Sequence, residues 1–101
     1  MLLVAILTVR RERRDDFERY EHAAARIMRR HGGAIERALV LDGTADRFRE
    51  LHVVRFADHA AFTRYREDPE LAALRELRDA AVVSTELWPA ADGPRYGDAG
   101  D

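Results

Sequence analysis

The chain of 101 residues contains no cysteine, and this absence excludes disulfide bonds, thiolate metal ligands and thiol catalysis. Lysine, asparagine and glutamine are absent as well, so every basic side chain is an arginine and Schiff-base catalysis through lysine is impossible. The 17 arginines are outweighed by 19 acidic residues, which gives a formal net charge of −2. A nucleic-acid partner held by bulk positive charge is therefore excluded.

Long hydrophobic runs are also missing. The apolar segment 2–9 has only eight residues, whereas a transmembrane helix needs about 20. No basic region precedes this segment and no small-residue cleavage site follows it. We therefore expect a cytoplasmic protein with no membrane partner.

The hydrophobic patterns that are present predict one domain at residues 1–89, with four strands and two helical regions. Apolar runs and alternation predict strands at 2–9, 34–41, 48–56 and 81–88. Three- and four-residue spacing predicts a helix at 11–31, ended by two glycines. A second helical region begins after Asp58 and restarts at Asp68-Pro69. The remaining segment 90–101 is predicted to be a disordered tail.

The order strand, helix, strand, strand, helix, strand is the split βαβ, or ferredoxin-like, pattern. It predicts an α+β protein whose four-stranded antiparallel sheet carries both helical regions on one face. Apolar residues occupy both faces of the first, second and fourth strands, so the other face should not meet water. Packing that face against a second copy across a two-fold axis is the simple solution, and we expect a homodimer.

His52 is the first candidate for chemistry, because its alternation with Val54 and Phe56 places it on the face expected to look toward the helices. A histidine there can take or give a proton near neutral pH, with Glu50 or Glu86 as its partner carboxylate. The alternative is a hydrogen-bonded core histidine. Glu86 is likewise either a catalytic pocket acid or a paired charge at the sheet edge.

Arg37 is the third candidate catalytic residue. It lies in an apolar strand, where a buried arginine needs a carboxylate or an anionic ligand as its partner. It can bind an acidic or enolate oxygen of a substrate, or pair with Glu50 or Glu86 across the sheet. Arg78 is expected to tie the last helical stripe to the sheet.

Four aromatic residues are candidates for substrate binding. Tyr20 and Tyr65 lie on the inward faces of the predicted helices, where they can place hydroxyl groups in a cavity or simply pack. Phe56 shares the inward face of its strand with His52. Trp88, near a strand end, is expected to wall the pocket or the dimer interface.

The four histidines show neither HxxxH nor HxH spacing, which argues against a zinc site built from protein ligands alone. Haem would need an axial ligand such as His52 or His31. The only glycine pair ends a helix instead of opening one, so it offers no phosphate site. We expect no cofactor and no metal.

Four segments resemble the dimeric α/β-barrel superfamily, and within it small proteins of the DUF1330 type. They are HVVRF at 52–56, DHAAF at 58–62, YREDP at 65–69 and LRELR at 74–78. The resemblance covers about residues 2–88. It implies two sheets paired into a barrel at a dimer interface, and a ligand cavity between each sheet and its own helices.

The superfamily includes cofactor-free monooxygenases, polyketide cyclases, lactone isomerases and haem proteins, so a likeness of fold does not select the chemistry. Anthrone-type monooxygenases of this fold are associated with an asparagine, tryptophan and tyrosine set, and this chain has no asparagine. Plant-type cyclases use a histidine where this chain reads DPEL at 68–71. DUF1330-type chains often carry a tyrosine near the position of Leu71.

We therefore expect a small cofactor-independent enzyme that acts by acid/base chemistry, as a cyclase or an isomerase, on an apolar, oxygen-bearing, polyketide-like metabolite. His52 would be the general acid or base, and Arg37 with a tyrosine would stabilise oxyanion charge. One alternative is a non-catalytic ligand-binding or structural dimer, and another is a cofactor-free monooxygenase. The acid/base enzyme requires His52 to line a cavity, whereas a purely structural protein would have His52 within a filled core.

Overall fold

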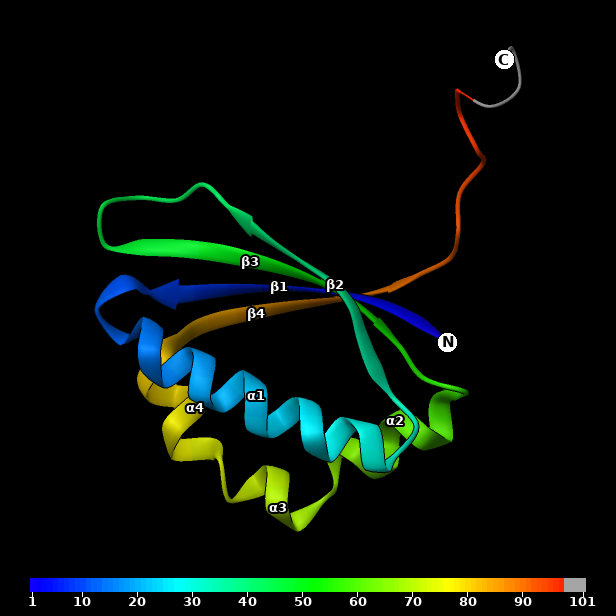
Figure 1. Ribbon diagram of the computed structural model, residues 1–101, viewed down its shortest axis with the longest axis horizontal. Coiled ribbons are helices and arrows are strands. Elements are labelled where there is room, and N and C mark those ends of the chain that lie inside the picture. The colour runs from blue at the N-terminus through cyan, green and yellow to red at the C-terminus, as the bar shows by residue number, and fades with distance from the viewer. Residues whose placement is uncertain (98–101) are drawn as a thin grey trace.

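A four-stranded antiparallel sheet with all helices on one face forms the body of the computed structural model, which describes residues 1–97 (Figure 1). The strands are β1 (Leu2–Arg10), β2 (Ala34–Leu41), β3 (Arg47–Arg55) and β4 (Val82–Ala90), in the order β2-β3-β1-β4. The helices are η1 (Arg11–Arg13), α1 (Arg14–Arg30), α2 (His59–Arg66), α3 (Pro69–Ala72) and α4 (Arg75–Ala81). The predicted α+β, ferredoxin-like fold is confirmed.

Local chemistry explains where the helices begin and break. The carboxylates of Asp58 and Asp68 accept hydrogen bonds of 2.8 Å from the backbone N–H groups of Ala61 and Glu70, so they cap α2 and α3 as predicted. The helical region after Pro69 is not continuous, because it breaks between α3 and α4. None of the described helices is both long enough and apolar enough to cross a membrane.

The fourth strand is longer than predicted. Pro89 was expected to end it, yet β4 continues through Pro89 to Ala90. β4 is an edge strand that pairs only with β1, and an edge strand tolerates a residue without a backbone N–H. Within the predicted tail, residues 91–97 form no helix or strand and Tyr96 is exposed, whereas residues 98–101 lie outside the described part.

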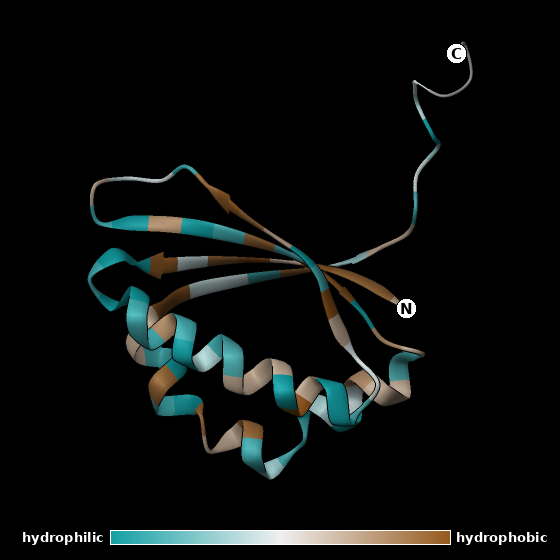
Figure 2. Ribbon diagram, in the orientation of Figure 1, coloured by the Kyte–Doolittle hydropathy of each residue, from teal (hydrophilic) through white to brown (hydrophobic). Residues whose placement is uncertain are grey.

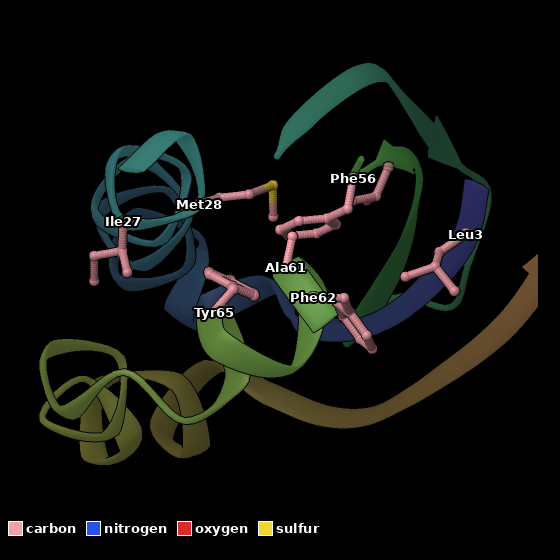
Figure 3. Packing of buried hydrophobic residues seen from close by; sticks show 8 residues of the cluster. Leu3, Ile27, Met28, Phe56, Ala61, Phe62 and Tyr65 are labelled. Carbon is pink, nitrogen blue, oxygen red and sulfur yellow. The ribbon is translucent and has the colours of Figure 1, made fainter. Parts of the chain in front are cut away.

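The core between sheet and helices consists of two separate clusters. One lies around Phe56 and contains Leu3, Ile27, Met28, Val54, Phe56, Ala61, Phe62 and Tyr65 (Figure 3). The other contains Leu7, Val9, Phe17, Phe48, Ala81 and Val82. Along β3, Glu50 and His52 come between Phe48 of one cluster and Val54 of the other, so polar residues sit where the two clusters meet.

The opposite face of the sheet is covered by no described element (Figure 1). We call it the open face, and the pairing register assigns to it Leu2, Val4, Ile6, Thr8, Ala34, Arg37, Leu39, Leu41, Arg47, Arg49, Leu51, Val53, Arg55, Ser84, Glu86, Trp88 and Ala90. Its centre is apolar, because Val4 and Ile6 of β1 pair there with Val53 and Leu51 of β3; Figure 2 shows brown stretches along both strands. Trp88 at one edge is 58% exposed and Leu39 near the other is 39% exposed.

Candidate functional site

A cavity of about 560 Å³ lies between the sheet and its helices. Its apolar lining includes Leu3, Met28, Ile35, Val54, Phe56, Phe62 and Leu71. Its polar lining includes Tyr20, Glu21, His52, Tyr65, Arg78, Asp79 and Thr85. On the row that joins β3, β1 and β4, the small Ala5 stands between His52 and Leu87, which leaves space beside the imidazole.

The buried imidazole of His52 lies between two carboxylates. Its Nε2 atom is 2.8 Å from Oε1 of Glu50, two residues earlier on the same face of β3. Its Nδ1 atom is 3.8 Å from Oε2 of Glu21 on α1. An ionised carboxylate only accepts hydrogen bonds, so Nε2 carries the proton that Glu50 accepts, and in neutral imidazole Nδ1 is left as the free base.

Glu21 is a site residue that the sequence reading missed. Desolvation raises the pKa of this carboxyl above its usual value, while the neighbouring His52 opposes the shift and Glu50 adds to it. The signal was present in the sequence, because Glu21 follows Phe17 by four residues and precedes Ala24 by three. A carboxylate at this spacing belongs to the buried stripe of the helix.

Tyr20 and Arg78 form the second polar group of the cavity. The guanidinium of Arg78 donates a hydrogen bond to Oγ1 of Thr85 on β4, which confirms that this arginine ties its helix to the sheet. Burial raises the pKa of Tyr20, although Arg78 beside the hydroxyl opposes the shift. Burial likewise raises the pKa of Tyr65. Both phenols therefore stay protonated near neutral pH and can donate hydrogen bonds into the cavity.

The structure brings together four of the seven predicted site residues: His52, Tyr20, Tyr65 and Phe56 line the cavity. Arg37, Glu86 and Trp88 are on the open face, so the sheet separates them from His52. Glu50, not Glu86, is the carboxylate that partners His52.

The prediction that Arg37 is buried is wrong. β2 pairs Ile35 with Val54 and then shifts register, so that Arg37 pairs with Val53. This irregularity changes the alternation of the strand, and Ile35 and Arg37 lie on opposite faces of the sheet. The predicted pairings of Arg37 also fail, because Glu50 faces the helices and Glu86 is on the other edge strand.

Two interactions fasten the far end of α1 to α3, whose Leu71 lines the cavity. Nε2 of His31 is 2.8 Å from Oδ2 of Asp68, and the guanidinium of Arg30 donates two hydrogen bonds to Glu70. The bond from His31, together with the backbone N–H of Glu70, lowers the pKa of Asp68. Among residues 1–97, no group of three or more acidic or histidine side chains is arranged to hold a metal ion.

The sheet, its one-sided helices and the cavity between them define a ferredoxin-like α+β protein with a partly open pocket of ligand size. The model of a domain of unknown function, DUF1330, matches residues 3–88, and the chain belongs to this family. No curated protein sequence matches the chain.

Solved structures agree with the fold. SnoaB, a cofactor-independent oxygenase from Streptomyces nogalater, matches with a TM-score of 0.64 and 18% identity, over 93% of this chain and 96% of its own. A candidate antibiotic biosynthesis monooxygenase from Bacteroides thetaiotaomicron matches with a TM-score of 0.69 and 19% identity, over 91% and 88%. At such identities the likeness establishes the fold and not the activity.

The raised pKa of Glu21 predicts that this residue reduces stability. At pH values between the pKa of 4.5 in the unfolded chain and the higher pKa in the folded chain, the folded state binds the Glu21 proton more tightly than the unfolded state does. The free energy of unfolding therefore falls as pH rises through this window, and the whole penalty is present above it. Glu21→Gln should raise the Tm at pH 7, and this gain should disappear below pH 4.5.

Thermal unfolding followed by circular dichroism across this pH range measures the effect. Glu18→Gln, at an exposed position on the same helix, is the matched control and should stay within about 0.5 kcal/mol of the parent chain. A lower Tm for Glu21→Gln at pH 7, or a gain that is the same at both ends of the range, would contradict the account.

Proposed function

We propose that the protein is a cofactor-independent enzyme that moves a proton on a small, apolar, oxygen-bearing molecule bound in the cavity. The observation that carries this proposal is the hydrogen bond from Nε2 of His52 to Glu50, which leaves Nδ1 as a base beside the cavity. General acid–base catalysis needs such a group within reach of the reacting molecule.

The proposed first step is removal of a proton from a carbon next to a carbonyl group. Nδ1 of His52 takes this proton, and the electron pair moves onto the carbonyl oxygen as an enolate. The protonated hydroxyl of Tyr20, with Arg78 beside it, donates to the developing oxyanion. Return of the proton to another position gives an isomerisation, and attack of the carbanion on a second carbonyl gives a cyclisation.

A cofactor-free monooxygenase is the second candidate, because the same removal of a proton would begin that reaction, followed by reaction of the carbanion with dioxygen. The fold shared with the oxygenase SnoaB favours this candidate. Uptake of dioxygen in an oxygen-electrode assay with anthrone as the probe distinguishes oxygenation from a proton transfer that consumes none.

The proton-transfer proposal is tested with 2-tetralone in heavy water, where proton NMR follows exchange at the carbon next to the carbonyl. The wild-type chain should accelerate this exchange over buffer, and His52→Gln should reduce the acceleration by about 10²–10⁴-fold. His22→Gln, exposed on α1, is the matched control and should exchange like the wild type.

A structural histidine gives a different result. His52→Gln would then lower the free energy of unfolding by about 1–3 kcal/mol, through an unsatisfied buried partner, without changing exchange. That outcome contradicts the proposal, and so does a wild-type chain that exchanges no faster than buffer. The second of these outcomes would leave a ligand-binding protein without turnover.

We also propose that the open face is the contact surface of a homodimer, and its charges favour one orientation. Arg37, Arg47 and Arg49 lie on the β2 and β3 half of this face, where Arg55 is already paired with Glu36, whereas Glu86 lies on β4. A two-fold axis perpendicular to the strands would place β2 over the same strand of the partner, so that the arginines of the two copies would repel each other. An axis along the strands sets the basic half against the acidic edge.

Paired residues form rows across the sheet, and an axis along the strands places each row over the same row of the partner. Arg37 shares its row with Trp88, and Glu86 is on the adjacent row of the same face. In the second orientation Arg37 therefore comes near the partner's Glu86. Arg37→Glu and Glu86→Arg should each raise the dimer Kd at least about tenfold, and the double exchange should restore it. Arg64→Glu, exposed on α2, is the control. Sedimentation equilibrium measures the Kd; a monomeric wild type, or a double variant no better than the singles, contradicts the proposal.

A further inference from the structure

Glu21 combines low exposure with the lack of a partner, because its carboxylate forms no hydrogen bond with any residue among 1–97. Glu50 accepts a hydrogen bond from His52, and the Asp79 side chain, which also forms no hydrogen bond, is 63% exposed. The nearest recorded partner of Glu21 is Nδ1 of His52 at 3.8 Å, which is beyond hydrogen-bond distance. Yet the Glu21 side chain is only 18% exposed, and it lines the cavity.

A carboxylate removed from most of the solvent is costly unless a donor replaces the lost water. No described side chain supplies that donor. We infer that the ligand does: the cavity takes a neutral molecule with a hydroxyl group on an apolar ring system, and this hydroxyl donates its hydrogen bond to Glu21. The inference shares its cavity with the proposed function, but it concerns recognition and does not require turnover.

The charges around Glu21 favour a neutral ligand over an anionic one. Glu50 reinforces the negative potential at Glu21, and the guanidinium of Arg78 is already engaged with Thr85 and with the hydroxyl of Tyr20. A ligand carboxylate at this place would therefore face a like charge in surroundings that screen it poorly. Arg66 and Arg75 also line the cavity but are exposed, so they offer an anion only solvated contacts.

The rest of the cavity indicates the shape of the ligand. Phe56 lies with its ring centroid 5.4 Å from that of Phe62 and 5.5 Å from that of Tyr65, and Figure 3 shows Met28 pointing toward the same ring. Such a wall of rings suits a fused aromatic or partly reduced ring system. The volume of about 560 Å³ falls within the range of small-molecule pockets.

Three naphthalenes that differ only in the polar group test this inference. They are 2-naphthol, which donates a hydrogen bond, 2-methoxynaphthalene, which does not, and 2-naphthoate, which is anionic. In isothermal titration calorimetry at pH 7, the wild-type chain should bind 2-naphthol at least about tenfold more tightly than either of the others. A hydrogen bond to a charged group typically supplies a difference of this size.

Glu21→Met removes the acceptor and keeps the length of the side chain. It should weaken binding of 2-naphthol by about 10–100-fold and leave 2-methoxynaphthalene unchanged or bound more tightly. Glu18→Met, exposed on the same helix, should bind all three like the wild type. Circular dichroism verifies that each variant is folded, and Glu21→Gln, whose amide oxygen still accepts, should give an intermediate preference if the methionine variant does not fold.

The inference is overturned if the wild-type chain binds 2-naphthol and 2-methoxynaphthalene equally, if it prefers 2-naphthoate, or if it binds none of the three. It is also overturned if a folded Glu21 variant keeps the full preference for the hydroxyl. Failure of the proposed catalysis looks different, because exchange of 2-tetralone would then be absent while the preference for 2-naphthol persists.

Discussion

The hydrogen bond between His52 and Glu50 is the interaction around which the helix side of the sheet is organised. It joins two polar side chains of β3 at the point where the two apolar clusters of the core meet, and it occupies the imidazole nitrogen that lies away from Glu21. Burial of an unpaired imidazole or carboxylate would be costly. Each of the two groups supplies the hydrogen-bond partner that the other needs away from solvent. The cavity lies beside this polar pair, and its lining includes His52, the small Ala5 and the partly buried carboxylate of Glu21.

The sheet separates two kinds of surface through the simple alternation of its strands. On β3, Glu50 and His52 face the helices while Arg49, Leu51 and Val53 face the other way. The residues of the cavity and those of the open face thus alternate along the strand. A slip of the pairing by a single position would move each set to the opposite face. Regular pairing of β1 with β3 over nine residues protects this assignment, whereas the irregularity in β2 falls at an edge, where it disturbs only Ile35 and its neighbours.

Much of the fold and part of the site follow from the sequence, for reasons that particular residues make clear. Strand alternation was sufficient to place His52 and Phe56 toward the helices, and helical spacing was sufficient for Tyr20 and Tyr65. Arg37 was misplaced because a shift in register leaves no mark in a short strand where residues such as Ala34 and Ala38 fit either face. Glu21 was overlooked because a charged residue is ordinarily assigned to solvent, although its spacing from Phe17 and Ala24 put it on the buried stripe. The break between α3 and α4 follows no glycine or proline, so tertiary packing decides it.

The central claim is that Glu50 fixes the tautomer of His52 and leaves Nδ1 as the free base toward the cavity. Nitrogen-15 NMR of the imidazole, at a pH where His52 is neutral, measures this directly, with the His52→Gln variant assigning the resonances. The account predicts a proton on Nε2 and an unprotonated Nδ1, and a loss of this preference in Glu50→Gln. A neutral imidazole that carries its proton on Nδ1 in the wild-type chain would contradict it.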